Sequence, residues 1–104
     1  MASYFFVKLI GPRPTFAHDM SDEETQLMVQ HGKYLLSAYE AGKLHIYGPV
    51  MAPEGAFGMA VFDAADEAEV RKVMDADPSI LSGMNRYEVY PMMIGALRGI
   101  TPAK

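Results

Sequence analysis

The sequence predicts one mixed α+β domain with the element order β-α-β-β-α-β. The chain has 104 residues, half of them hydrophobic, which is enough for one hydrophobic core and too little for two. Two helix start signals, in which a Ser or Asp precedes a Glu by three residues, begin at Ser21 and Asp66. Segments rich in aromatic and β-branched residues lie before, between and after these signals, as strands of this order would.

Four segments have the composition of strands. Both faces of residues 3–10 are nearly apolar, so we expect both faces of this strand to be covered. The segment ends at Gly11-Pro12. The connection at 50–55 is short and contains turn residues, which predicts an antiparallel hairpin. Pro91 is expected to end the last strand. The predicted strands are residues 3–10, 43–49, 56–62 and 85–90.

The first predicted helix spans residues 22–41. Ser21 and Glu24 form its capping box, and Gly42 is suited to end it. Residues 11–20, before it, are predicted to be a loop because two prolines disfavour a helix there. The apolar stripe of the helix follows the spacing i, i+4, i+7, i+8 and i+11. Its members are Leu27, His31, Tyr34, Leu35 and Ala38.

The second predicted helix spans about residues 67–76 and begins at Asp66. It ends at Asp77, because a residue that precedes proline avoids the α region. A short turn is expected at residues 80–83. The apolar stripe of this helix consists of Val70, Val73 and Met74.

This element order is typical of the ferredoxin-like, or split βαβ, fold, in which an antiparallel sheet carries both helices on one face. The other face of the sheet is too apolar to contact water, and a homodimer that stacks two sheets would cover it. The apolar tail from about residue 92 is expected to dock on the domain or on a partner subunit. We therefore predict a single domain over residues 1–104 that forms a homodimer.

Composition argues against several classes of function. Nine Lys and Arg residues against thirteen Asp and Glu residues give a net charge of −4, so no nucleic-acid or membrane partner is expected. The sequence has no cysteine, which excludes disulfides and thiolate metal sites and fits a reducing compartment. No apolar stretch reaches the length of a membrane span, and the first residues do not resemble a secretory signal. We expect a cytoplasmic protein.

His31 and Asp77 are the leading candidates for chemistry. His31 lies on the apolar stripe of the first helix, and a buried imidazole is the usual general base near neutral pH. Asp77 continues the inward stripe of the second helix, where a carboxylate is costly unless it is paired. Because both helices pack on one face of the sheet, the two side chains are expected to meet. The same residues also fit a buried pair with a structural role.

Other polar residues are candidates for a binding site. Arg13 lies between two prolines. Its side chain could bind an anionic substrate or be exposed to solvent. His45 and Tyr47 are predicted to share one strand face, where they would line a cavity or pack between subunits. His18 precedes Asp19, but the spacing of the three histidines matches no metal site. Phosphate-loop and dinucleotide-binding patterns are absent from the sequence, so neither a metal nor a cofactor is expected.

A series of short motifs runs in a fixed order from Tyr4 to about Met93. The motifs are Gly11-Pro12-Arg13-Pro14-Thr15-Phe16, Asp19-Met20, Glu23-Glu24, His31 with Tyr34, Gly42-Lys43-Leu44, Gly48-Pro49-Val50, Asp75-Ala76-Asp77-Pro78, Ser82-Gly83, Tyr87-Glu88-Val89 and Pro91-Met92. Their order and spacing resemble the YciI-like (YCII-related) family over nearly the whole chain.

The resemblance implies a dimeric α+β barrel. It also implies an active site formed by a His–Asp pair, which matches His31 and Asp77, with a half-site around Gly48-Pro49 nearby. One family member is linked to dehydrochlorination of a chlorinated hydroxyquinol, and the wider fold includes muconolactone isomerases. The sequence departs from many members in its short 50–55 loop and in His45, where an aliphatic residue is common. Because of these departures, the resemblance does not identify the substrate.

We expect a cofactor-independent lyase or isomerase that acts on a small, aromatic-derived compound. His31 would move a proton, while Asp77 would fix the tautomer of the ring and stabilise the imidazolium. The alternatives are a non-catalytic module that binds a small ligand and a purely structural dimer. The candidate substrate-binding residues are Arg13, Phe16, Tyr34, Gly48 and Pro49.

Overall fold

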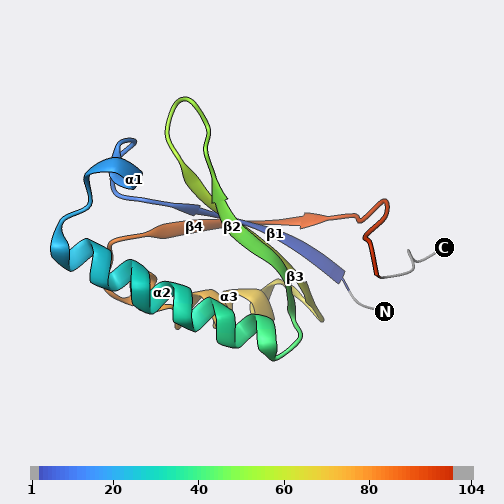
Figure 1. Ribbon diagram of the computed structural model, residues 1–104. Helices are drawn as coiled ribbons and strands as arrows, with labels where there is room; N and C mark the ends of the chain where they lie inside the picture. Colours follow the sequence, from blue (N-terminus) through green and yellow to red (C-terminus); the bar gives the residue numbers. More distant parts are fainter. Residues whose placement is uncertain (1–2, 100–104) are drawn as a thin grey trace.

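Four strands and four helices make up the part of the chain that the computed structural model describes, residues 3–99 (Figure 1). The structure confirms the mixed α+β class. The strands are β1 (Ser3–Ile10), β2 (Leu44–Val50), β3 (Phe57–Ala64) and β4 (Arg86–Met92). The helices are α1 (Phe16–Asp19), α2 (Asp22–Glu40), α3 (Glu67–Asp75) and α4 (Pro78–Leu81).

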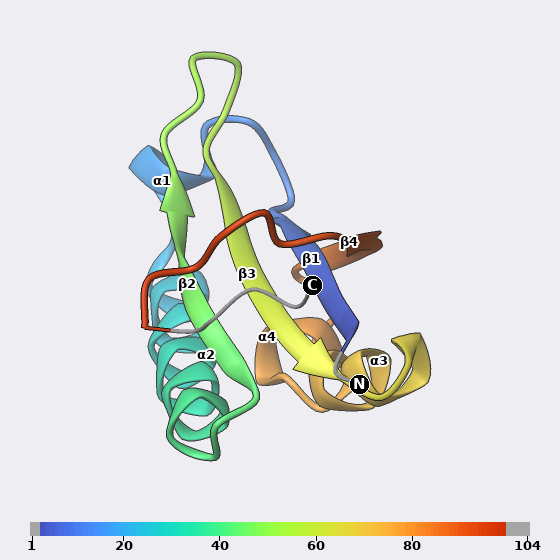
Figure 2. The same cartoon turned by 90° about the vertical axis from the view of Figure 1, so that its right-hand side faces the viewer.

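β1 lies inside the sheet and pairs antiparallel with both β3 and β4, which gives the strand order β2-β3-β1-β4. The antiparallel hairpin predicted for β2 and β3 is confirmed. Alternate residues of β1, namely Phe5, Val7 and Leu9, are buried, because α2 and α3 both cover that face of the sheet (Figures 1 and 2). Successive side chains of a strand point to opposite faces, so one face of β1 supplies the core.

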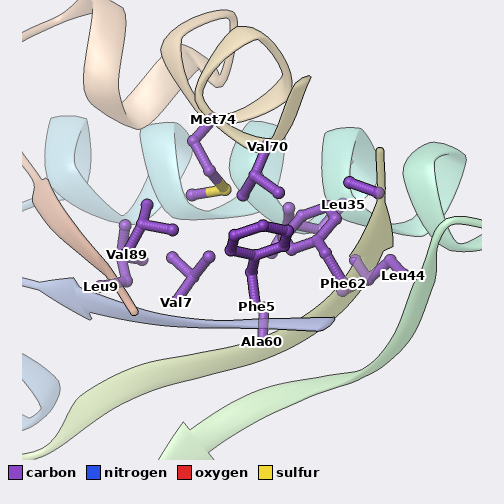
Figure 3. Packing of buried hydrophobic residues seen from close by; sticks show 11 residues of the cluster. Phe5, Val7, Leu9, Leu35, Leu44, Ala60, Phe62, Val70, Met74 and Val89 are labelled. Atoms are coloured by element: carbon purple, nitrogen blue, oxygen red, sulfur yellow. The ribbon is translucent and has the colours of Figure 1, made fainter. Parts of the chain in front are cut away.

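The hydrophobic core lies between the sheet and the two longer helices (Figure 3). Phe62 of β3 stands opposite Phe5 of β1, and both belong to the buried cluster with Leu35 of α2 and Val70 of α3. Full burial of a side chain of this size contributes roughly 1.5–3 kcal/mol. Since Leu35 anchors α2 on the sheet, the position of His31, one helical turn earlier, is fixed by the same packing.

The start of α2 is held by its own cap and by the segment before it. The Ser21 hydroxyl accepts the Glu24 N–H, and the Glu24 carboxylate accepts the Ser21 N–H. Arg13 donates two hydrogen bonds to the same carboxylate, at 2.8 and 2.9 Å. Hydrogen bonds from Arg13 and from the Ser21 backbone lower the pKa of Glu24 from an ordinary 4.5 to about 2. Residues 11–20 are therefore tied to α2 at this point.

Substitution Glu24→Gln is expected to weaken the acid dependence of stability. A carboxyl whose pKa is lowered on folding stabilises the protein at pH values above its ordinary pKa. This contribution disappears as the pH falls towards 2. Gln preserves the capping box but removes the charge. Thermal melts between pH 7 and pH 3 should show the variant less stable at neutral pH, with the difference narrowing below about pH 4.5.

The control for this experiment is Glu67→Gln, which removes one charge of an exposed ion pair within α3, with Arg71. A surface pair of this kind contributes little to stability. A difference between wild type and Glu24→Gln that stays constant from pH 7 to pH 3 would contradict the assigned role of the Arg13–Glu24 contact.

β2 contains a β-bulge that the sequence did not predict. Leu44 and Ile46 stand opposite adjacent residues of β3, which leaves His45 as the extra residue. Leu44 and Tyr47 therefore both pack against the core, while Ile46 is exposed. The prediction that His45 and Tyr47 share a strand face is wrong, because the bulge shifts the alternation by one residue.

Two short helices occupy segments that were predicted as loop and turn. The prolines that disfavour a helix lie before α1, at positions 12 and 14, so a single turn forms after them. α4 begins with Pro78, a residue suited to the first helical position. Pro91 lies within β4 rather than ending it. β4 is an edge strand, where a missing N–H is tolerated.

The sheet face opposite the helices is also largely apolar. Ile46 of β2 and Tyr90 of β4 are about half exposed there. Strand register places these apolar residues on this face: Tyr4, Phe6, Ile10, Ile46, Val50, Phe57, Met59, Val61, Tyr90 and Met92. The same register also places four charged residues there: Lys8, Asp63, Arg86 and Glu88.

The segment after β4 lies at the opposite end of the sheet from α1 (Figure 1). Residues 100–104 of the tail lie outside the described residues, and docking of the tail stays a prediction. Within residues 3–99, no helix is both long enough and apolar enough to cross a membrane.

Candidate functional site

His31 and Asp77 are in direct contact. The distance from His31 Nδ1 to Asp77 Oδ2 is 2.6 Å, which is short for a hydrogen bond and typical of one that involves a charged group. Asp77 is fully buried, and the His31 side chain is 12% exposed. The two residues are 46 positions apart and come from different helical segments, so the fold of the whole domain brings them together.

Asp77 occupies the junction between two helices. Its N–H donates to the Met74 carbonyl at the end of α3, and its Oδ1 accepts the Ser79 N–H as the cap of α4. One carboxylate oxygen is thus used to hold the backbone and the other to hold His31. Both hydrogen bonds satisfy a carboxylate that would otherwise be costly to bury.

This arrangement determines which nitrogen of His31 carries a proton. A buried carboxylate is an acceptor, so Nδ1 must be the donor in the contact with Asp77. Nε2 has no hydrogen-bond partner among residues 3–99. In the neutral ring Nε2 is therefore the unprotonated nitrogen, which can accept a proton from a bound molecule.

An apolar cavity of about 500 Å³ lies beside His31. It is lined by residues of β1, α1, α2, β2, β3, α3 and the hairpin loop, and its lining includes several methionines, Leu9 and Phe57. His31 contributes the one imidazole of the described lining, Tyr47 of β2 contributes a phenol, and no Asp, Glu, Lys or Arg belongs to it. A cavity of this size, with few polar groups, suits a small ring compound.

Gly55 allows the hairpin loop to close one side of the cavity. Its φ of 143° lies in a region that other residues rarely adopt, and a Cβ there would lie 3.2 Å from the backbone of Pro14. The loop can therefore pack directly against the segment that carries Phe16, which is part of the cavity wall.

Three of the five candidate substrate-binding residues line this cavity with His31. Phe16 of α1 is buried and contributes to its wall, and Gly48 and Pro49 contribute from β2. The other two candidates, Arg13 and Tyr34, do not belong to the lining.

Arg13 and Tyr34 have partners elsewhere. The guanidinium of Arg13 contacts Asp19 and Glu24, and the hydrogen bonds with these two carboxylates raise its pKa. The Tyr34 hydroxyl donates to the Val73 carbonyl at 2.6 Å and so joins α2 to α3. Burial, followed by the nearby charge of Asp77, raises the pKa of Tyr34.

The remaining histidines do not line the cavity. His18 is exposed on α1, next to the cavity wall but not part of it. His45 Nε2 lies 3.2 Å from Asp63 Oδ2, and its ring is 5.8 Å from that of Tyr4. Among residues 3–99, no group of three or more His, Asp or Glu side chains is arranged to hold a metal ion.

Sequence reasoning missed several residues of the wall. Met28 and Gly32 lie on the same side of α2 as His31, and the helical spacing could have indicated them. Asn85, just before β4, also lines the cavity, and no local pattern pointed to it. Its position depends on how α4 turns back into the sheet.

Substitution Gly32→Ala is expected to stabilise the protein by about 0.5–1 kcal/mol, because glycine within a helix is unfavourable. A Cβ at this position would meet no atom within 4 Å. Thermal melts should show a rise in Tm of a few degrees. The matched control is Gly58→Ala, where a Cβ would lie 3.0 Å from the Leu9 side chain and should destabilise. Loss of stability in Gly32→Ala would mean that the space beside His31 is not open.

Comparison with known proteins bears on the family and the fold. The family model of the YCII-related domain matches residues 4–93. Among solved structures, 5-chloro-2-hydroxyhydroquinone dehydrochlorinase (TftG) from Burkholderia phenoliruptrix AC1100, in complex with 2,5-dihydroxybenzoquinone, is similar with a TM-score of 0.63. The sequences are 17% identical, and the match covers 88% of this chain and 95% of the other. At this identity the likeness shows the fold. No functionally curated protein matches the sequence.

Proposed function

The chain belongs to the YCII-related domain family, and from this premise we propose that it is a small-molecule enzyme of the lyase or isomerase type. In this proposal His31 and Asp77 are the acid–base pair, and the apolar cavity binds the substrate. One observation carries the proposal: the cavity wall presents an imidazole whose Nδ1 is held by a buried carboxylate and whose Nε2 is free of partners among residues 3–99.

The proposed chemistry begins with proton transfer to His31 Nε2. Asp77 orients the ring and stabilises the imidazolium that forms, as a carboxylate does for other catalytic histidines. The imidazolium then returns the proton to another atom of the substrate, which is an isomerisation, or releases it after a leaving group has departed, which is an elimination. Neither reaction needs a cofactor, since His31 supplies both the base and the acid.

The substrate class follows from the cavity. Its volume of about 500 Å³ accommodates one ring with small substituents, and its walls are mostly aliphatic and aromatic. The similar fold of an enzyme named for the dehydrochlorination of 5-chloro-2-hydroxyhydroquinone supports a hydroxylated, halogenated ring as the first candidate. In the step proposed here for such a ring, one hydroxyl proton moves to the carbon that bears chlorine. A second hydroxyl proton and chloride then leave, so HCl is lost without an external oxidant.

Chloride release tests the proposal. Purified protein is incubated without oxygen with 5-chloro-2-hydroxyhydroquinone, and free chloride is measured against a protein-free control. In a second assay, muconolactone is incubated in deuterated water, and deuterium incorporation is measured. Catalysed conversion of either compound above background supports the proposal. Binding of both compounds without conversion would contradict it for these substrates.

A non-catalytic ligand-binding module is the second candidate. It is favoured by the position of Arg13 and Tyr34, whose polar groups contact other protein residues rather than the cavity. A substrate would then meet few groups able to stabilise charge. In this case the compounds would be recovered unchanged after long incubation with the protein.

We also propose that two copies form a dimeric α+β barrel. The strand order β2-β3-β1-β4, with both longer helices on one face, supports a ferredoxin-like fold. The opposite face carries apolar side chains from all four strands, and a second copy of the same face would remove them from water. No partner chain of another kind is required.

Substitution Ile46→Lys is expected to shift the protein towards the monomer. Ile46 is 54% exposed on the apolar sheet face, so a lysine there would bury a charge in the proposed interface. Val29→Lys is the matched control, because Val29 is 53% exposed but lies on α2, away from that face. Sedimentation equilibrium should show a dimer for wild type and Val29→Lys and a weakened dimer for Ile46→Lys. A wild type that stays monomeric at high concentration would contradict the dimer.

A further inference from the structure

The Asn85 side chain is an unusual part of the cavity wall. Asn85 is 4% exposed, and its Oδ1 is buried and has no hydrogen-bond partner among residues 3–99. Buried polar atoms in folded proteins nearly always have a partner, and those without one call for a specific explanation. The proposed proton transfer makes no use of this residue.

Asn85 and His31 line the same cavity, and Met28 lies next to both of them. Asn85 Nδ2 lies 3.5 Å from Met28 Sδ, which is a weak acceptor. Met28 lies three residues before His31 on α2, so the two side chains are neighbours on one face of the helix. All three residues line the same cavity. Asn85 therefore belongs to the wall that also presents the imidazole.

The fold holds Asn85 through its backbone rather than through its side chain. The Asn85 N–H donates to the Ser79 carbonyl at 3.0 Å, and the Ser79 N–H donates to Asp77 Oδ1 at 2.8 Å. The segment that positions Asp77 thus also positions Asn85. An apolar side chain of similar volume could keep this backbone arrangement, so the amide group itself is not needed for the turn.

We infer that the Asn85 carboxamide binds an oxygen substituent of the ligand and thereby sets its orientation relative to His31. The contact with the Met28 thioether is weak, and Met28 is flexible, so the amide can exchange this contact for a ligand hydroxyl or carbonyl at little cost. Asn85 would then be a specificity residue that favours an oxygen-bearing ring over an apolar ring of the same size. The inference deepens the proposed function, because it rests on the same cavity being the ligand site.

A buried water is the competing explanation for the unpartnered amide oxygen. The Ser79 hydroxyl is also buried without a partner, and one water bridging both groups would satisfy them. Ser79 does not line the cavity, however. A substitution at Ser79 therefore separates the two explanations, since it removes a similar polar group from the same turn without changing the cavity wall.

The test compares phenol with toluene, which has nearly the same shape but lacks the hydroxyl. Both affinities are measured by NMR titration of the ¹⁵N-labelled full chain, in wild type, Asn85→Leu, Asn85→Ala and Ser79→Ala. Changes in cavity size or stability affect both affinities alike, so they cancel in the ratio of phenol affinity to toluene affinity. We expect this ratio to fall roughly two- to tenfold in both Asn85 variants and to stay unchanged in Ser79→Ala. The alanine variant keeps the test valid if leucine disturbs folding.

Several results would overturn the inference. An unchanged ratio in the Asn85 variants would exclude a contact between the amide and the hydroxyl. An equal fall in Ser79→Ala would assign the effect to a shared water, and failure of wild type to bind either probe in the cavity would remove the ligand site. These outcomes are independent of catalysis. If the ratio behaves as expected but no ring compound is ever converted, the inference holds and the proposed enzyme fails.

Discussion

Substitution His31→Ala is expected to lower kcat/KM by roughly 100- to 10,000-fold for any compound that the protein converts, the range typical of general acid–base catalysis. His31 is the one imidazole in the described cavity lining, where Tyr47 is the other ionisable side chain. A neutral phenol is a poor base, so Tyr47 is not expected to take over the proton from the substrate. The variant leaves the buried Asp77 carboxylate without this partner and should be less stable, so its activity is measured under conditions where it is folded.

The matched control is His45→Ala. His45 also contacts an aspartate, Asp63, and its side chain is 17% exposed, close to the value for His31. It does not line the cavity beside His31. Initial rates of chloride release, with circular dichroism to check folding, should therefore show a large loss for His31→Ala alone. Full activity in His31→Ala would contradict the assigned base.

Substitution Asp77→Ala is expected to reduce the free energy of unfolding by about 3 kcal/mol. The change removes a helix cap, which costs about 1 kcal/mol, and a hydrogen bond to a charged group, which costs about 1.5–3 kcal/mol. Because Asp77 is fully buried, water cannot replace either contact easily. Urea denaturation at pH 7 measures the loss. Asp63→Ala, which breaks the more exposed pair with His45, serves as the control and should cost clearly less.

Asp77→Asn separates the two roles of this residue. Asparagine caps a helix as well as aspartate does, so α4 should stay in place and the loss of stability should be smaller. Its amide nitrogen can donate to His31 Nδ1, however, which would favour the tautomer with a proton on Nε2. We therefore expect this variant to lose activity while it keeps most of its free energy of unfolding. Equal stability of Asp77→Ala and wild type would contradict the buried contact.

Local sequence patterns were sufficient for the longer elements. The capping box at Ser21 and Glu24 fixes where α2 begins, and the apolar stripe of α2 fixes which face packs on the sheet. His31 lies on that stripe, and Asp77 continues the stripe of α3. Because two stripes on one sheet face must converge, the 2.6 Å contact between them could be anticipated from spacing. Whether the pair is catalytic does not follow from spacing.

Features that depend on strand pairing could not be predicted in the same way. The bulge at His45 arises from the register between β2 and β3, and a single extra residue reversed the expected direction of Tyr47. Tolerance of Pro91 within β4 follows from its edge position in the sheet. Asn85 reaches the cavity only because α4 redirects the chain after Asp77. These positions depend on tertiary structure, which short-range patterns do not encode.

Heteronuclear NMR of the His31 imidazole tests the central claim most directly. The ¹⁵N and ¹H resonances of both ring nitrogens are followed from pH 5 to pH 9, with and without phenol. We expect Nδ1 to keep its proton throughout, held by Asp77, and the resonance of Nε2 to shift when phenol binds. A proton on Nε2 with Nδ1 unprotonated, or an Nε2 resonance that phenol leaves unchanged, would contradict the proposed acid–base site.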